Sequence, residues 1–170
     1  MVAYSFYKNF VYTMPLLLYG IVSGWSGQTI YDMYLLTIYN VFFTFWPIVL
    51  FSIFDWELPI KEMVMKPRMY SDGKKRFYLT IWEWTKWQFE AILVGFVIAY
   101  LSVYVGRNDL TEDGKVPGMW LQGCLCYTSV IFIVTWKVLA ESNTFNWLII
   151  FFDFGSIGFY FLVFWFESQI

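Results

Sequence analysis

Long apolar runs follow one another along this chain of 170 residues. A hydrocarbon layer about 30 Å thick needs roughly 20 apolar residues to be crossed by an α-helix. Only helices and closed barrels satisfy every backbone hydrogen bond in such a layer, and the runs lack the alternation of barrel strands. We therefore predict an all-α, polytopic membrane helix bundle with about five transmembrane helices. The predicted spans are about 3–24, 35–54, 82–105, 119–139 and 147–166.

Composition supports this fold class and excludes several functions. Of the residues, 59% are hydrophobic and only 14% are charged, whereas soluble domains contain about 25% charged residues. The net charge is −2, so nothing favours nucleic-acid binding, and the absence of histidine excludes imidazole metal sites and histidine catalysis. We predict one membrane domain over 1–170, without catalytic or metal-binding residues of its own.

The distribution of basic residues predicts the orientation of the bundle. Of eleven Lys and Arg residues, six lie between the second and third spans. They are Lys61, Lys66, Arg68, Lys74, Lys75 and Arg76. Loops rich in Lys and Arg stay in the cytosol, which makes about 55–81 a cytosolic loop. Alternation of the spans then predicts a cytosolic N-terminus, an exoplasmic C-terminus, and outer loops at 24–34 and 106–118.

Polar residues interrupt the second span in the stretch YNVFFTFWP, residues 39–47. Asn40, Thr44 and Pro47 have the spacing i, i+4, i+7, which predicts a common face on an α-helix. Pro47 also leaves the carbonyl of Phe43 without its helical donor and should produce a kink. Two interpretations stay open for this polar face: hydrogen bonds to a neighbouring helix, or the lining of a path for a solute.

The first and fifth spans also contain polar side chains. Lys8 and Asn9 lie early in the first span, and extension of Lys8 to the cytosolic surface is an interpretation that stays open. Pro15 should kink the first span and leave the carbonyl of Val11 facing other protein or water. Asp153 has no evident partner in its own span, so we expect it either to face another helix or to be protonated and neutral.

Charged residues near the cytosolic ends of the third and fourth spans have the spacing of ion pairs. Glu83 and Lys86 are spaced i, i+3 and should pair. Glu90 should share Lys86 or face a neighbouring helix. Lys137 and Glu141 are spaced i, i+4, which predicts an ordinary pair at the end of a helix.

Several short motifs, taken in chain order, resemble the fifth to ninth membrane helices of the type-IV P-type ATPases, the phospholipid flippases. The motifs are YSFYKN (4–9), SGWSGQTIYD (23–32), YNVFFTFWP (39–47), SIFDWEL (52–58), KPRMY (66–70), WEW (82–84), KVLAES (137–142) and FGSI (154–157). The similarity is most specific over 4–58. It implies that the chain is the C-terminal transmembrane part of an ATP-driven phospholipid translocase that lines the lipid head-group path. The alternative is a flippase-like anchor or structural subunit that does not transport.

The resemblance also implies roles for individual residues. Lys8 and Asn9 match a Lys-Asn pair of the family's fifth helix near the transport path. Asn40 matches an asparagine of the sixth helix that bonds the head group, and Thr44 is its neighbour. ATP and Mg²⁺ would bind in domains outside this sequence, so whether the chain takes part in an enzyme stays open.

The partners that the resemblance implies are of three kinds. They are the remainder of a flippase chain, an accessory β-subunit at the exoplasmic loops, and membrane phospholipids. The expected location is a eukaryotic plasma membrane or endomembrane.

Overall fold

The computed structural model describes residues 2–55, 80–108, 118–142 and 147–167, together with residues 64, 65, 73 and 169. Every regular element within this part of the chain is helical, so the predicted all-α class is confirmed. The predicted loops at about 55–81 and 106–118 lie almost entirely outside the described residues, and their placement stays a prediction.

The helices fall where the apolar runs predict them, with one interruption. Three consecutive elements form the second span: α2 (Met33–Ile38), the π-helix η1 (Tyr39–Phe43) and α3 (Phe45–Phe54). The other helices are α1 (Val2–Val22), α6 (Ile81–Asn108), α7 (Met119–Glu141) and α8 (Trp147–Glu167). Among the described residues, four segments are long and apolar enough to cross a membrane: Met33–Phe54, Ile81–Tyr104, Met119–Glu141 and Trp147–Phe166. Helix α1 has a similar length of 21 residues and carries a lysine.

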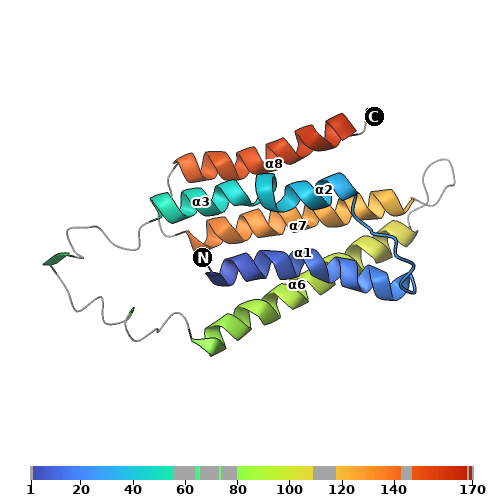
Figure 1. Ribbon diagram of the computed structural model, residues 1–170, viewed down its shortest axis with the longest axis horizontal. Coiled ribbons are helices and arrows are strands. Elements are labelled where there is room, and N and C mark those ends of the chain that lie inside the picture. Colours follow the sequence, from blue (N-terminus) through green and yellow to red (C-terminus); the bar gives the residue numbers. More distant parts are fainter. Residues whose placement is uncertain are drawn as a thin grey trace.

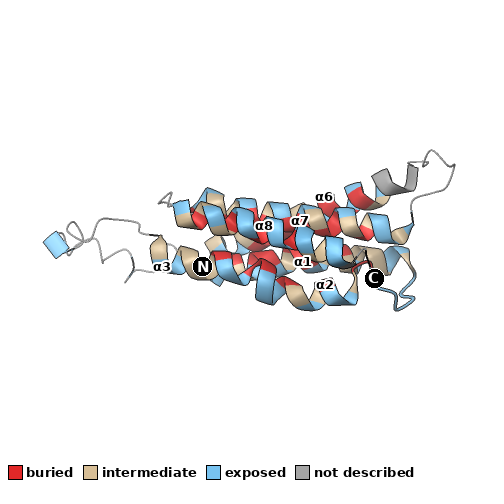
Figure 2. Ribbon diagram, turned by 90° about the horizontal axis from the view of Figure 1, so that it is seen from above, coloured by how far each residue is buried: buried red, intermediate tan, exposed pale blue. Residues whose placement is uncertain are grey.

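The helices form two staggered layers. Helices α6, α7 and α8 make one layer, and α1 makes the other with the second span (Figure 2). Helix α7 is central, because it contacts α1, α3, α6 and α8. Buried residues gather where the two layers face each other (Figure 2). Helix α1 begins and α8 ends at opposite ends of the bundle (Figure 1).

Tyrosine side chains fill much of the space between the layers. Tyr12 stacks on Tyr39 with ring centroids 4.1 Å apart, and the edge of Tyr127 meets Tyr39 at 6.1 Å. A buried hydroxyl usually finds a partner, and the hydroxyls of Tyr39 and Tyr127 bind backbone carbonyls. The hydroxyl of Tyr127 donates to the carbonyl of Leu35 at 2.9 Å. Tyrosines therefore fix the backbone of the second span against α7 and α1.

Gly95 permits a close approach between α6 and α1. A Cβ atom on Gly95 of α6 would lie 2.6 Å from Cβ of Met14 and 3.2 Å from the carbonyl oxygen of Val11. The carbonyl that Pro15 deprives of a donor thus faces another helix, as the sequence predicts. Helix α1 continues without interruption through Pro15, and a kink there stays a prediction.

The charged residues at the N-terminal end of α6 and the C-terminal end of α7 pair much as their spacing predicts. Lys86 donates to Glu83 at 2.7 Å, and Lys137 lies 3.4 Å from Glu141. Glu90 pairs with the neighbouring helix, since the Lys137 ammonium donates to both of its carboxylate oxygens at 2.9 and 3.2 Å. This bidentate contact connects α6 and α7 across 47 positions in sequence.

Candidate functional site

A buried lysine and a buried threonine meet where α1 faces the interruption of the second span. The ammonium of Lys8 donates to the hydroxyl oxygen of Thr44 at 2.7 Å. Their exposed fractions are 7% and 3%. The interpretation in which Lys8 extends to the membrane surface is therefore wrong, and its ammonium is bonded within the bundle.

The interruption lies inside the stretch YNVFFTFWP. The π-helix η1 ends at Phe43, Thr44 has φ −120° and ψ −10°, and α3 begins at Phe45. Pro47 falls in the first turn of α3, where its missing N–H removes no hydrogen bond from that helix. The carbonyl of Phe43, which would pair with residue 47 in a regular helix, accepts the hydroxyl of Ser156 on α8 instead.

Three hydrogen bonds form a closed ring around the buried lysine. Lys8 donates to Thr44, and the hydroxyl of Thr44 donates to the backbone carbonyl of Tyr39 at 3.1 Å. The hydroxyl of Tyr39 in turn donates to the backbone carbonyl of Lys8 at 3.2 Å. The ring fixes the lysine ammonium against the second span, and Tyr39 contributes both a backbone and a side-chain atom to it.

The π-helix changes which residues share a face. Its i→i+5 pattern places an additional residue in the turn, so the α-helical relation between residues 40 and 44 does not hold across it. Thr44 and Pro47 are buried, whereas Asn40 is exposed. The predicted common face is therefore wrong for Asn40. Asn9 is also exposed, so the structure brings Lys8 and Thr44 together and leaves both asparagines on the surface of the described bundle.

Sequence reasoning did not identify the supporting roles of Tyr39 and Ser156. Tyr39 is the first residue of the YNVFFTFWP stretch, and nothing in its spacing indicates a contact with Lys8, 31 positions earlier. A signal for Ser156 does exist, because Pro47 implies a carbonyl that needs a donor. Asp153, one turn before Ser156, is fully buried, as expected for a side chain that faces other helices. Neither of its carboxylate oxygens has a hydrogen-bond partner among the described residues.

The chemistry available at this contact is hydrogen-bond donation by the Lys8 ammonium to an anion or a carbonyl, because the hydroxyl of Thr44 already donates to Tyr39. A lysine ammonium carries three N–H donors, one of which serves Thr44. In the described part of the chain, no three His, Cys, Asp or Glu side chains could hold a metal ion together.

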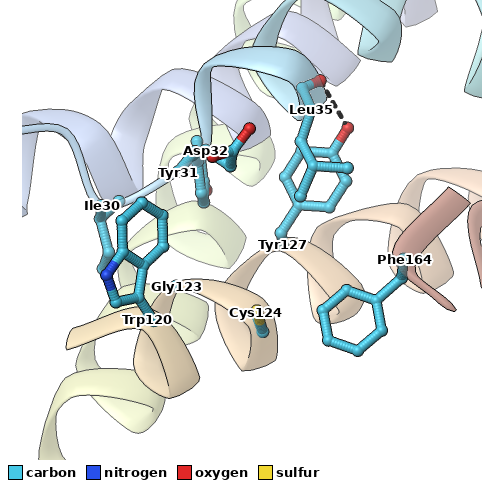
Figure 3. A pocket seen from close by; sticks show the side chains of 9 residues that line it. All are labelled: Ile30, Tyr31, Asp32, Leu35, Trp120, Gly123, Cys124, Tyr127 and Phe164. Carbon is cyan, nitrogen blue, oxygen red and sulfur yellow. Dashed lines mark hydrogen bonds between the residues drawn. The ribbon is translucent and has the colours of Figure 1, made fainter. Parts of the chain in front are cut away.

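A separate hollow of about 360 Å³ lies where the connection after α1 meets α7 (Figure 3). It is lined by Ile30, Tyr31, Asp32, Leu35, Trp120, Gly123, Cys124, Tyr127 and Phe164. Its main polar groups already serve the fold: Asp32 accepts from the N–H of Tyr34 at 2.7 Å and caps α2, and Tyr127 donates to Leu35. A Cβ atom on Gly123 would lie 2.1 Å from the carbonyl oxygen of Ile30. This hollow therefore belongs to the packing of the segment between α1 and α2 against α7.

Comparisons with known proteins agree with the motifs. The family described as "Phospholipid-translocating P-type ATPase C-terminal" matches residues 1–170. Human phospholipid-transporting ATPase IG is 33% identical over 168 residues, and mouse phospholipid-transporting ATPase 11C is 32% identical over 168 residues; each alignment covers 97% of this chain. Phospholipid-transporting ATPase tat-1 of Caenorhabditis elegans is 31% identical over 158 residues, or 92% of this chain.

The chain spans about 15% of the length of these curated relatives. The family match nonetheless extends over the whole chain, and the apolar helices agree with an integral, multi-pass membrane protein. This chain therefore belongs to the family of C-terminal membrane regions of phospholipid-translocating P-type ATPases.

Proposed function

We propose that this chain is the C-terminal transmembrane part of an ATP-driven phospholipid translocase, and that Lys8 and Thr44 line the path of the lipid head group. The observation that carries the proposal is the buried ammonium of Lys8 at the interruption of the second span. Single π-turns within helices occur frequently at functional sites, and an intramembrane ionisable residue is a candidate for function by default.

The cost of burying Lys8 supports a role beyond packing. A lysine at the centre of a membrane costs about 2.5–3.5 kcal/mol on insertion scales. An apolar side chain of similar length would fill the same space without this cost. A phospholipid head group carries an anionic phosphodiester, and a lysine ammonium binds phosphate as a compact positive charge. We therefore propose that the Lys8 ammonium, whose burial costs free energy, donates hydrogen bonds to the phosphodiester of a passing head group.

The exposed asparagines support the same placement of the path. Asn9 lies beside Lys8 on α1, and Asn40 lies in η1 of the facing span. A side-chain amide placed in hydrocarbon without partners is unfavourable. Each of these two side chains therefore needs a polar neighbour, either the head group or another part of a complete pump.

Energy for transport would come from parts of the pump other than this chain. We propose that ATP and Mg²⁺ bind there, as the similarity to phospholipid-transporting ATPases implies. The proposed partners are the remainder of the translocase chain, membrane phospholipids, and an accessory β-subunit on the exoplasmic side.

The test uses the complete pump that contains this chain, purified and reconstituted with phospholipid. Lys8→Met and Thr44→Val each remove a polar group with little change of shape. Loss of a hydrogen bond to a charged group costs about 1.5–3 kcal/mol, so the half-saturating lipid concentration for ATP turnover should rise about ten- to hundredfold. Lys86→Met is the matched control, because Lys86 is exposed and pairs with Glu83.

The same preparations should be assayed for movement of a labelled phospholipid across vesicles. Normal lipid dependence in both Lys8→Met and Thr44→Val would contradict the head-group role. It would favour the alternative, a flippase-like anchor or structural subunit that does not transport.

A further inference from the structure

The hydroxyl of Ser156 replaces a backbone donor that the second span lacks. In a regular helix the carbonyl of Phe43 would accept the N–H of residue 47, which is proline. Ser156 on α8 donates to that carbonyl instead, across 113 positions in sequence. Both residues are buried, with exposed fractions of 1% for Phe43 and 6% for Ser156. The donor therefore comes from a different helix.

Most hydroxyls on the other helices are used differently. They donate to the carbonyl four residues earlier in their own helix, as helical Ser and Thr side chains commonly do. This pattern holds for Thr13, Thr37, Ser52, Thr85, Thr128 and Ser129. Ser156 instead bonds a carbonyl of a separate element, so its hydroxyl connects two spans.

Aromatic side chains surround this contact. A groove of about 350 Å³ between the second span and α8 includes Ser156 in its lining. Its other lining residues are Phe42, Trp46, Phe151, Phe152, Gly155 and Phe159. In hydrocarbon, an unsatisfied backbone carbonyl costs several kcal/mol. The interruption of the second span is therefore stable where a side chain supplies the missing donor.

The contact lies one residue from the proposed path. Thr44 follows Phe43 directly, has non-helical dihedral angles, and holds the ammonium of Lys8. We infer that Ser156 is a positioning residue: its hydroxyl fixes the end of η1 and thereby places Thr44 against Lys8. Its consequence for transport rests on the function proposed above, whereas its effect on the backbone does not.

The experiment compares Ser156→Ala with Ser129→Ala in the complete pump. Ser129 is exposed on α7 and donates to its own helix, so its variant controls for the loss of a hydroxyl. In Ser156→Ala we expect amide hydrogen exchange over residues 39–47 to rise at least tenfold. We also expect the half-saturating lipid concentration to rise three- to tenfold, with maximal ATP turnover changed less than twofold. Ser129→Ala should leave all three quantities at wild-type values.

A second pair of variants keeps the test decisive if Ser156→Ala fails to fold. Ser156→Thr retains the hydroxyl. Ser156→Val has nearly the same shape as the threonine variant but no hydroxyl. The threonine variant should show wild-type exchange and lipid dependence, whereas the valine variant should behave as described for alanine. Equal behaviour of the two variants would overturn the inference, because shape alone would then account for the effect.

The outcomes separate this inference from the proposed path. If Lys8→Met and Thr44→Val raise the half-saturating lipid concentration while Ser156→Ala changes neither exchange nor lipid dependence, the positioning role is refuted and the path is supported. If Ser156→Ala raises exchange over 39–47 but no variant changes lipid dependence, Ser156 holds the backbone and the proposed path is wrong.

Discussion

Lys8→Met should leave the fold at least as stable as the wild type, although Lys8 is buried and bonded. The lysine costs about 2.5–3.5 kcal/mol at the centre of a membrane, and a hydrogen bond to a charged group returns about 1.5–3 kcal/mol. Methionine has a similar length, carries no charge and adapts to irregular spaces. The hydroxyl of Thr44 keeps its own acceptor, the carbonyl of Tyr39, at 3.1 Å. The two terms together change stability by about −0.5 to +2 kcal/mol, where positive values favour methionine, so the balance is on the side of the variant.

The assay is thermal unfolding of the purified complete pump in detergent, followed by intrinsic tryptophan fluorescence. Gly123→Ala serves as the reference for a destabilised bundle, because its Cβ would lie 2.1 Å from a backbone carbonyl oxygen. The midpoint for Lys8→Met should equal or exceed that of the wild type. A decrease as large as that of Gly123→Ala would refute the reasoning, since Lys8 would then stabilise the bundle.

Three further predictions follow from individual contacts. Gly123→Ala should destabilise the bundle by about 1–3 kcal/mol through overpacking. Gly158→Ala should stabilise it by about 0.5–1 kcal/mol, because a Cβ there meets open space. The thermal unfolding midpoints of the two variants and the wild type test both values. Lys137→Met should cost about 1 kcal/mol through loss of its bidentate contact with Glu90, and Glu90→Gln should cost less in the same assay. Tyr39→Phe should raise the half-saturating lipid concentration two- to tenfold by opening the hydrogen-bond ring; a wild-type value would contradict the ring's role.

Much of the fold could be predicted because membrane helices leave a strong local signal. Apolar runs of about twenty residues identify the helices, and i, i+3 and i, i+4 spacings predict the pairs Lys86–Glu83 and Lys137–Glu141, which the structure contains. The effect of proline on backbone hydrogen bonds can also be predicted from the sequence. Pro47 implies a carbonyl without a helical donor, and the structure shows that the carbonyl of Phe43 takes its donor from another helix.

The remainder depends on contacts between segments far apart in sequence. An α-helical spacing rule cannot anticipate the π-turn at residues 39–43, so it assigns Asn40 to the face of Thr44 when the structure exposes it. The bond between Glu90 and Lys137 likewise depends on how α6 and α7 pack. Tyr39 was missed because its two polar contacts with α1 and with its own span appear only after the helices are assembled.

The most direct measurement is a double-mutant cycle between positions 8 and 44, read as the half-saturating lipid concentration for ATP turnover in the complete pump. The contact at 2.7 Å predicts strong coupling, as residues in direct contact usually show. Lys8→Met and Thr44→Val should each raise the half-saturating lipid concentration. The value for the double variant should not exceed that of the more affected single variant. Independent effects of the two substitutions, or no effect of either one, would contradict a head-group path at this ammonium and hydroxyl.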